Sequence, residues 1–402
     1  MSSYRIQGTT GEWEVVIGLE VHAQVTSNSK LFSGAAASFG AEPNTQVSLV
    51  DAAMPGMLPV PNAECIRQAV RTGLAIDAQI NRWSRFDRKN YFYADLPQGY
   101  QISQLYHPLV GEGHLEIDAD EKAGILEAKR IGVERIHVEQ DAGKLMHDQH
   151  PTRSYVDLNR SGVALMEIVS RPDMTSPAEA GAYLRKLRAI LRYVGSCDGN
   201  MEEGSLRCDA NVSLKPIGSE VLGTRSETKN VNSLRSVERA IRGEMIRHAE
   251  LLNDGKKVKQ ETRHFQEDTG LTRSGRSKEQ AEDYRYFPDP DLVPVTPLAS
   301  WIEELRATLP ERPSLRRKRI KEEWNVPDKE MAAMINADVL DIVEATVLLG
   351  ADPTKARTWW LGEISRIANE KELPIAELSI TPAHVAELVE LVAKGELTDK
   401  LA

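Results

Sequence analysis

The sequence predicts an α+β protein in which an antiparallel sheet with flanking helices is followed by an all-α region. Segments that alternate apolar and polar residues predict the strands, because successive side chains of a strand point to opposite faces. These segments are residues 14–22, 130–138, 206–214 and 224–230. Beyond the prolines of 288–297, apolar residues recur at helical spacing, which predicts helices at about 300–309, 311–324, 328–348, 354–370 and 381–394.

The composition is that of an ordinary soluble protein, with 41% hydrophobic and 27% charged residues over 402 positions. The sequence has no apolar run of membrane-spanning length and no signal-peptide core at its start, so we expect a cytoplasmic protein. Its cysteines, Cys65, Cys197 and Cys208, are scattered, which argues against a disulfide framework and a zinc site. Because the net charge is −10, any contact with RNA depends on a local patch or a partner.

The strand at 14–22 carries the first candidate site residues. Its apolar face consists of Val15, Ile17, Leu19 and Val21. Its other face carries Glu20 and His22, and a carboxylate beside an imidazole can hold a divalent cation. A solvated strand end with two polar residues explains the same pattern, and this strand alone favours that simpler interpretation.

The segment 86–103 follows a predicted helix at 63–76. It places Arg88 and Lys89 beside three aromatic residues, an arrangement that could clamp phosphates and stack a base. A hairpin edge with aromatic packing explains the segment equally well.

Each later strand adds a carboxylate to a polar row. The rows are His137 and Glu139; Arg207, Asp209, Asn211 and Ser213; and Arg225, Glu227 and Lys229. Residues 163–169 predict a central strand that is apolar apart from Glu167, which is either a paired core carboxylate or part of a site.

Helix-capping residues and glycines mark the ends of the remaining elements of this region. A capping box with proline at 176–179 begins a helix that Gly195 ends, and a second helix is expected at 236–252. We expect the basic face of the first helix to be solvated rather than bound to RNA. The charged, glycine-interrupted residues 256–275 predict a loop.

The polar rows suggest one shared site. If the strands pair into one sheet, a single face presents Glu20, His22, Glu139, Asp209 and Glu227. Hard oxygen ligands with one imidazole suit Mg²⁺ or Mn²⁺. Neighbouring arginines and lysines suit a triphosphate, so this chemistry indicates ATP-dependent phosphoryl transfer, although scattered carboxylates are common.

Five motifs give the sequence a family resemblance. They occur together and in order, at 16–22, 86–93, 137–144, 201–211 and 283–288. Over residues 13–402 the sequence closely resembles the B subunits of the aspartyl/glutamyl-tRNA amidotransferases (GatB). The resemblance implies a cradle domain at 1–295, likened to the glutamine synthetase fold, and a helical domain at 296–402. Relatives usually continue into a small tRNA-binding tail, which we expect to be absent because the chain stops at Ala402.

Motif matching to this family implies roles for individual residues. The catalytic residues and Mg²⁺ ligands would be Glu20, His22, Glu139, Asp209 and Glu227. Phosphate or substrate contacts would come from Arg88, Lys89, Arg207, Lys229 and Arg285. Tyr91 and Tyr93 would pack near the nucleotide, while His137 and Glu167 would support the ligands or belong to the core. Gln140 stands where many relatives have a second carboxylate, so the ligand role falls on Glu139 alone.

The resemblance also implies a reaction. The GatB chain would bind tRNA(Gln) mischarged with Glu or tRNA(Asn) mischarged with Asp, with ATP and Mg²⁺ in the cradle. The side-chain carboxylate would become an acyl phosphate, which ammonia from the GatA glutaminase would convert to an amide, in a complex that includes GatC. One alternative is a stand-alone ligase with its own ammonia source, but the sequence lacks a glutaminase signature. The other is a non-catalytic tRNA-binding scaffold, which the gathered carboxylates argue against.

Overall fold

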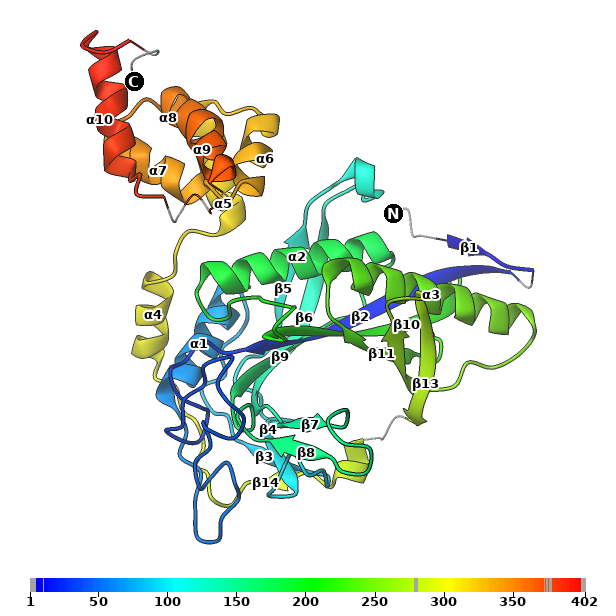
Figure 1. Cartoon of the computed structure of the whole chain (residues 1–402). Helices are drawn as coiled ribbons and strands as arrows, with labels where there is room; N and C mark the ends of the chain where they lie inside the picture. Colours follow the sequence, from blue (N-terminus) through cyan, green and yellow to red (C-terminus); the bar gives the residue numbers. More distant parts are fainter. Residues whose placement is uncertain are drawn as a thin grey trace. The chain divides into compact units, whose positions relative to one another are not determined.

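The computed structural model describes residues 5–9, 11–277, 281–371, 373, 375 and 378–398. The chain forms two compact units, residues 1–310 and 311–402 (Figure 1). The first contains a large sheet with helices, and the second is helical in its described parts. Among the described helices, none combines the length and apolar character that crossing a membrane requires.

A nine-stranded sheet organises the first unit. Its order is β13-β12-β11-β10-β2-β9-β6-β5, with β1 paired to β2. The strands are β1 (Arg5–Gln7), β2 (Glu12–Gln24), β5 (Gly113–Ile117), β6 (Lys129–Gln140), β9 (Ala164–Ser170), β10 (Leu206–Pro216), β11 (Ser226–Val231), β12 (Glu261–Gln266) and β13 (Leu271–Ser277). The predicted antiparallel pairing holds for every pair except β11 with β12, which are parallel.

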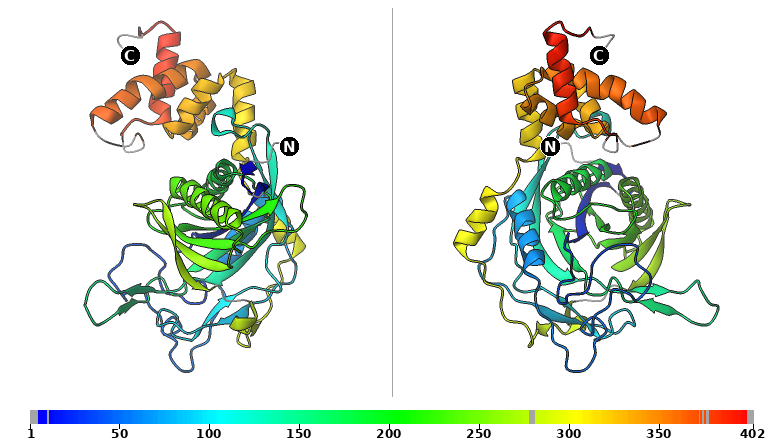
Figure 2. Two further views of the ribbon diagram at one scale, coloured as in Figure 1. Left: turned by 90° about the vertical axis from the view of Figure 1, so that its right-hand side faces the viewer. Right: turned by 60° about the vertical axis from the view of Figure 1, so that its left-hand side comes forward.

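The alternation of β2 separates a helix-covered face from a polar face. The apolar face is buried, and its members Val15, Ile17, Leu19 and Val21 join the main core. The helices α1 (Ala63–Ala75), α2 (Pro177–Tyr193) and α3 (Leu234–Asn253) contribute their apolar stripes to the same core. Figure 2 shows α2 and α3 side by side along one face of the sheet. The predicted strand alternation and these helices are therefore confirmed.

Two small sheets lie on the other side of the large sheet (Figure 1). One joins β14 (Phe287–Pro288), β3 (Asp87–Asn90) and β4 (Tyr100–Ser103), and the other pairs β7 (Lys144–Met146) with β8 (Tyr155–Asp157). The amide of Gln101 donates to the carbonyl of Gln140 at 2.8 Å, which ties β4 to the end of β6. The hairpin interpretation of residues 86–103 is therefore correct as to fold.

The proline-rich connector belongs to the first unit, so the structural boundary falls after Pro310 and not at the predicted position after 295. The backbone of Val295 exchanges hydrogen bonds with Ser84, which anchors the connector. The helix α4 (Ala299–Ala307) then buries Ile302 and Leu305 in the main core. Prolines marked a stiff segment but not the end of the packed unit.

The second unit has its own core around the fully buried Trp360. Its helices are α5 (Pro313–Trp324), α6 (Asp328–Asn336), α7 (Leu340–Leu348), α8 (Pro353–Trp359), α9 (Ser365–Glu370) and α10 (Pro382–Ala393), with a π-helical turn at Trp360–Ile364. The single helix predicted at 328–348 is wrong, because Asp338 adopts a left-handed φ of 54° and divides it.

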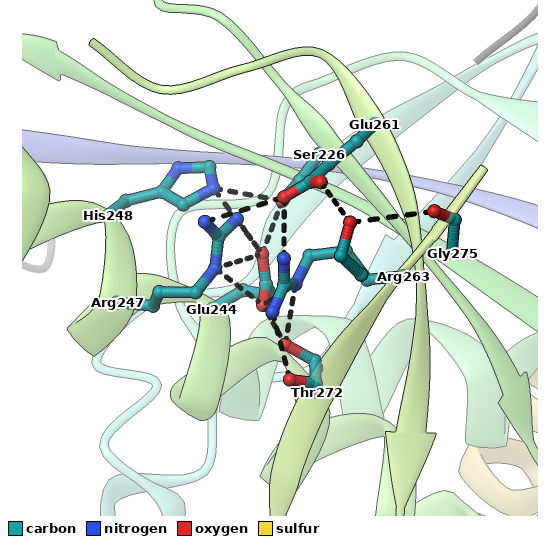
Figure 3. A network of polar contacts seen from close by, with 9 residues as sticks. Ser226, Glu244, Arg247, His248, Glu261, Arg263, Thr272 and Gly275 are labelled. Carbon is teal, nitrogen blue, oxygen red and sulfur yellow. Dashed lines mark hydrogen bonds and ion pairs between the residues drawn. The ribbon is translucent and has the colours of Figure 1, made fainter. Parts of the chain in front are cut away.

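The loop predicted at 256–275 is also wrong, because it contains β12 and β13. The charges that suggested a loop are neutralised inside a network centred on Glu244 of α3, shown in Figure 3. Arg247 and Arg263 approach its carboxylate at 2.6 and 3.1 Å, and the Ser226 hydroxyl donates to it at 2.5 Å. The network therefore holds β11, β12 and β13 against α3.

The electrostatics of Glu244 make its contribution pH-dependent. Burial alone would raise the pKa of this carboxyl, but hydrogen bonds from His248, Arg247, Ser226 and Thr272 hold its pKa well below the ordinary value of 4.5. The Glu244 carboxylate therefore contributes its full stabilisation of the folded chain at pH values above 4.5. This contribution is lost as the pH falls from there toward the lowered pKa.

Replacing this carboxylate tests the network. We expect Glu244→Gln to lower the free energy of unfolding at neutral pH by about 3 kcal/mol, because two largely buried guanidinium groups lose one of their two carboxylate partners and keep only Glu261. The deficit relative to wild type should shrink as the pH falls from about 7 to about 3. Urea denaturation at both pH values measures it, with the exposed Glu250→Gln of the same helix as control. An equal deficit at both pH values would contradict the assignment.

Candidate functional site

The polar face of the large sheet brings together residues from β10, β2, β9 and β6. Register places Glu20 opposite Asp209 and His22 opposite Glu167. Glu167 in turn lies opposite His137. Because cross-strand partners point to the same face, these side chains form one continuous polar surface.

A cluster of imidazoles and carboxylates occupies the middle of this face. His22 Nε2 lies 3.4 Å from Glu167 Oε2 and 4.0 Å from Glu139 Oε1. One ligand atom from each of these three residues lies within 4.8 Å of the others, so we call His22, Glu139 and Glu167 the cation group. Among the described residues, this is the set whose spacing fits a shared metal ion.

Supporting contacts fix the carboxylates of the cation group. The hydroxyl of Ser103 donates to Glu139 at 2.8 Å. His137 Nε2 lies 3.2 Å from Glu167 and 3.5 Å from Glu139, between the two carboxylates. Both carboxylates are thus oriented by neighbours that leave them facing His22.

Charge compensation governs the protonation of this cluster. Burial alone would lower the pKa of His137, but the Glu167 carboxylate and hydrogen bonds to Glu139 and Glu167 raise it to about 9. The pKa of His22 is raised in the same way, mainly by Glu167. Burial opposes ionisation of Glu167, yet His137 and His22 hold its pKa well below the ordinary range. At neutral pH, therefore, a protonated His137 offsets part of the negative charge of these carboxylates.

Asp209, Glu227 and Lys229 form a second group on the same face, the lysine group. Lys229 Nζ lies 2.7 Å from Asp209 and 3.6 Å from Glu227. The nearby Glu20 accepts a hydrogen bond at 3.0 Å from Asn211. The five residues expected to act as ligands therefore share one face, but they do not form one cluster. His22 and Glu139 belong to the cation group, Asp209 and Glu227 belong to the lysine group, and Glu20 lies in neither.

The predicted cationic contacts differ in their placement. Arg207 lies opposite His22 in the pairing of β10 with β2, and its Nη2 is 2.8 Å from Asp141. Burial would lower the pKa of Lys89, but the charges of Tyr286, Glu139 and Glu167 raise it, so this ammonium lies within electrostatic reach of the cation group. Together with Lys229 these cations surround the carboxylates.

Arg88 and Arg285 lie elsewhere. The guanidinium of Arg88 is held by Asp289 at 2.8 Å and Asp291 at 2.7 Å, and it stacks 4.1 Å from the Tyr100 ring. Adjacent strand residues point to opposite faces, so Arg88 turns away when Lys89 faces the site. Arg285 is exposed in the segment before β14.

Sequence reasoning left Glu167 out of the ligand set. The sequence did contain an indication of its role, because Glu167 is the one ionisable residue in a central strand that is otherwise mostly apolar. Asp141, which binds Arg207 and accepts from Gln24 at 3.1 Å, gave no such signal, since it follows the end of β6. Tyr91 and Tyr93 line a pocket at the end of β3.

The donor set fits a hard divalent cation. Two carboxylates and one imidazole at this spacing are suitable ligands for Mg²⁺ or Mn²⁺. The adjacent ammonium and guanidinium groups supply the positive charge that phosphates require. The fold and this face define the chain as a mixed α/β protein with a candidate cation and phosphate site on its main sheet.

Comparison with known proteins identifies the family. Residues 15–303 match the model of the GatB/GatE catalytic domain, and residues 341–402 match that of the GatB domain. The B subunit of the aspartyl/glutamyl-tRNA(Asn/Gln) amidotransferase of Rhizorhabdus wittichii is 64% identical, over 100% of this chain and 82% of the relative. That of Erythrobacter litoralis is 71% identical, over 87% of this chain and 70% of the relative. The chain belongs to the family of B subunits of these amidotransferases.

The protonation of the cluster can be measured directly. We expect His137 to titrate near a pKa of about 9 in the wild-type chain. In Glu167→Gln its pKa should fall by about 1–3 units, because the nearest negative charge is removed. NMR titration of labelled histidines measures the change. The exposed Glu116→Gln on the neighbouring β5 is the control, and an unchanged His137 titration in Glu167→Gln would refute this arrangement.

Proposed function

We propose that this chain activates the side-chain carboxylate of Glu-tRNA(Gln), Asp-tRNA(Asn) or both, as part of an ATP-dependent amidotransferase. The observation that supports this most strongly is the geometry of the cation group on the polar face of the main sheet, in a chain that belongs to the family of amidotransferase B subunits. The charge of Lys89 interacts with the same carboxylates. The helices on the opposite face are in keeping with the cradle, likened to glutamine synthetase, that the resemblance implies.

The proposed reaction has two steps. A carboxylate oxygen of the attached amino acid attacks the γ-phosphorus of ATP, and ADP leaves, which gives an acyl phosphate. Ammonia then attacks the acyl carbon, phosphate leaves and a proton is lost, which gives the amide. The carboxylate is already ionised at neutral pH, so the first step does not depend on a strong general base.

Residues of this chain would position the reactants. Lys89, Arg207 and Lys229 would attract the phosphates and the substrate carboxylate, since all three remain cationic at neutral pH. His22, Glu139 and Glu167 would hold Mg²⁺, with Glu20, Asp209 and Glu227 on the same face as further ligands. When bound, the ion supplies neutralisation of the charge on the transferring phosphoryl group.

Partners complete the proposal. The relatives are named as the B subunits of amidotransferases, which implies a complex of several chains. We propose that a GatA glutaminase supplies the ammonia, that GatC completes the heterotrimer, and that mischarged tRNA(Gln) or tRNA(Asn) is the substrate.

ATP hydrolysis by the assembled complex tests the assignment. With mischarged Glu-tRNA(Gln), glutamine and Mg²⁺ present, we expect Glu20→Ala, Asp209→Ala and Glu167→Gln each to lower hydrolysis by about a hundredfold or more, because groups that organise the reacting charges are lost. The matched control is Glu116→Ala, whose carboxylate is exposed on β5.

Two results would count against this function. Undiminished hydrolysis in the variants would show that the polar face is not the kinase site. Retained tRNA binding by a wild-type complex that never hydrolyses ATP would favour the non-catalytic scaffold.

Cation binding provides a separate test with its own pH dependence. His22 must be neutral to act as a ligand, and its pKa is raised above 6.5. The apparent affinity for Mn²⁺ should therefore increase with pH, by about tenfold per unit below that pKa. Mn²⁺ titrations followed by electron paramagnetic resonance at about pH 6, 7 and 8 measure this. His22→Ala should weaken binding and flatten the pH dependence, the exposed His147→Ala should change neither, and a pH-independent wild-type affinity would contradict the ligand assignment.

A further inference from the structure

An aromatic pocket of about 860 Å³ opens where β3 ends. Its rings come from two segments that are far apart in the sequence: Tyr91, Phe92, Tyr93, Tyr284 and Phe287. We call this set the aromatic pocket. It combines the second and the last of the five sequence motifs, and the proposed chemistry above does not use it.

The backbone around the aromatic pocket is firmly anchored. The side-chain amide of Asn90 donates to the carbonyls of Tyr284 at 3.1 Å and Arg285 at 2.8 Å, which joins the two segments. Phe287 pairs with Arg88 between β14 and β3. Tyr91 contacts Tyr93 and Tyr284 edge to face, with ring centroids 5.7 and 6.1 Å apart. The pocket is therefore preorganised.

Its rings are nevertheless exposed to an unusual degree. Phe92 is 86% exposed, Tyr93 46% and Phe287 43%. Exposed aromatic rings gathered at one place are typical of a binding surface, because contact with a ligand would remove their apolar area from water. Rings presented in this way stack unpaired nucleobases.

Lys89 connects the aromatic pocket to the cation group. Its ammonium lies 4.8 Å from the centre of the Tyr284 ring and 5.9 Å from that of Tyr91. The negative charges of Glu139 and Glu167 also act on this ammonium and raise its pKa. A ligand in the pocket would thus lie next to a lysine whose charge also interacts with the cation group.

We propose that the aromatic pocket stacks the unpaired 3′-terminal nucleotides of the aminoacylated tRNA. This inference rests on the proposed function, because the reacting amino acid is esterified to the terminal ribose and that nucleotide must lie next to the site. Three exposed rings suit a flexible single strand better than the adenine of ATP, since small-molecule sites enclose most of their ligand. With a net charge of −10, the chain also gains more from stacking than from bulk attraction to phosphates.

The test uses the assembled complex and removes one exposed ring. The probe is tRNA(Gln) with 2-aminopurine in place of its terminal adenine, whose fluorescence is quenched on stacking. The wild-type complex should quench it, and Phe92→Ala should lose the quenching while Phe92→Trp retains it. In steady state, Phe92→Ala should raise the KM for Glu-tRNA(Gln) about tenfold and leave the KM for ATP unchanged. The matched control is Phe39→Ala, a ring that is 70% exposed outside the pocket.

Each other outcome has a definite meaning. A raised KM for ATP alone would assign the pocket to the ATP base and overturn the inference. Unchanged quenching and KM values in Phe92→Ala would overturn it as well. Ring-dependent quenching in a complex that hydrolyses no ATP would uphold the pocket while the proposed function fails, because quenching does not require turnover.

Discussion

The pairing of β2 with β9 and β10 is the constraint on which the rest of the structure depends. Strand side chains alternate between faces, so this register alone sends Leu19 and Val21 into the core and Glu20 and His22 to the polar side. A slip of one residue would reverse the faces, burying two ionisable groups under α2 and α3. The apolar core and the candidate site therefore specify each other.

Buried charge is the second organising feature. Carboxylates on the polar face are paired with imidazole and ammonium groups, as for Glu167 with His137 and Asp209 with Lys229. Such pairs offset the cost of desolvation but leave charges that can be redistributed when a ligand arrives. The Glu244 network behaves differently, because its charges are satisfied on the helix-covered side of the sheet, where they hold β11, β12 and β13 against α3.

Local sequence patterns predicted the features that depend on neighbouring residues, such as the alternation of strands and the starts of helices. The alternation of β2, β6 and β10 and the N-cap Ser176 of α2 were enough to place these elements and the shared polar face. The predicted capping box of α2 is only half formed, because the Glu179 carboxylate accepts from the backbone of Thr175 and not from that of Ser176. The prediction of a loop at 256–275 was wrong, because Arg263 pairs with Glu244 on α3, and no local stretch of sequence reveals that pairing. The opposed directions of Arg88 and Lys89 could have been predicted from their being neighbours in a strand. The split of the proposed ligands into two groups could not, since it depends on side-chain contacts between strands.

The position of β2 in the chain has a consequence for how the site comes into being. Glu20 and its hydrogen-bond partner Asn211 are 191 positions apart in the sequence. Contacts of such long range close large loops and form late in folding. During synthesis, β2 must wait for β9 and β10 to emerge, so its apolar side chains stay exposed on the nascent chain while the intervening segments are made. The polar face is therefore incomplete until most of the first unit has been made.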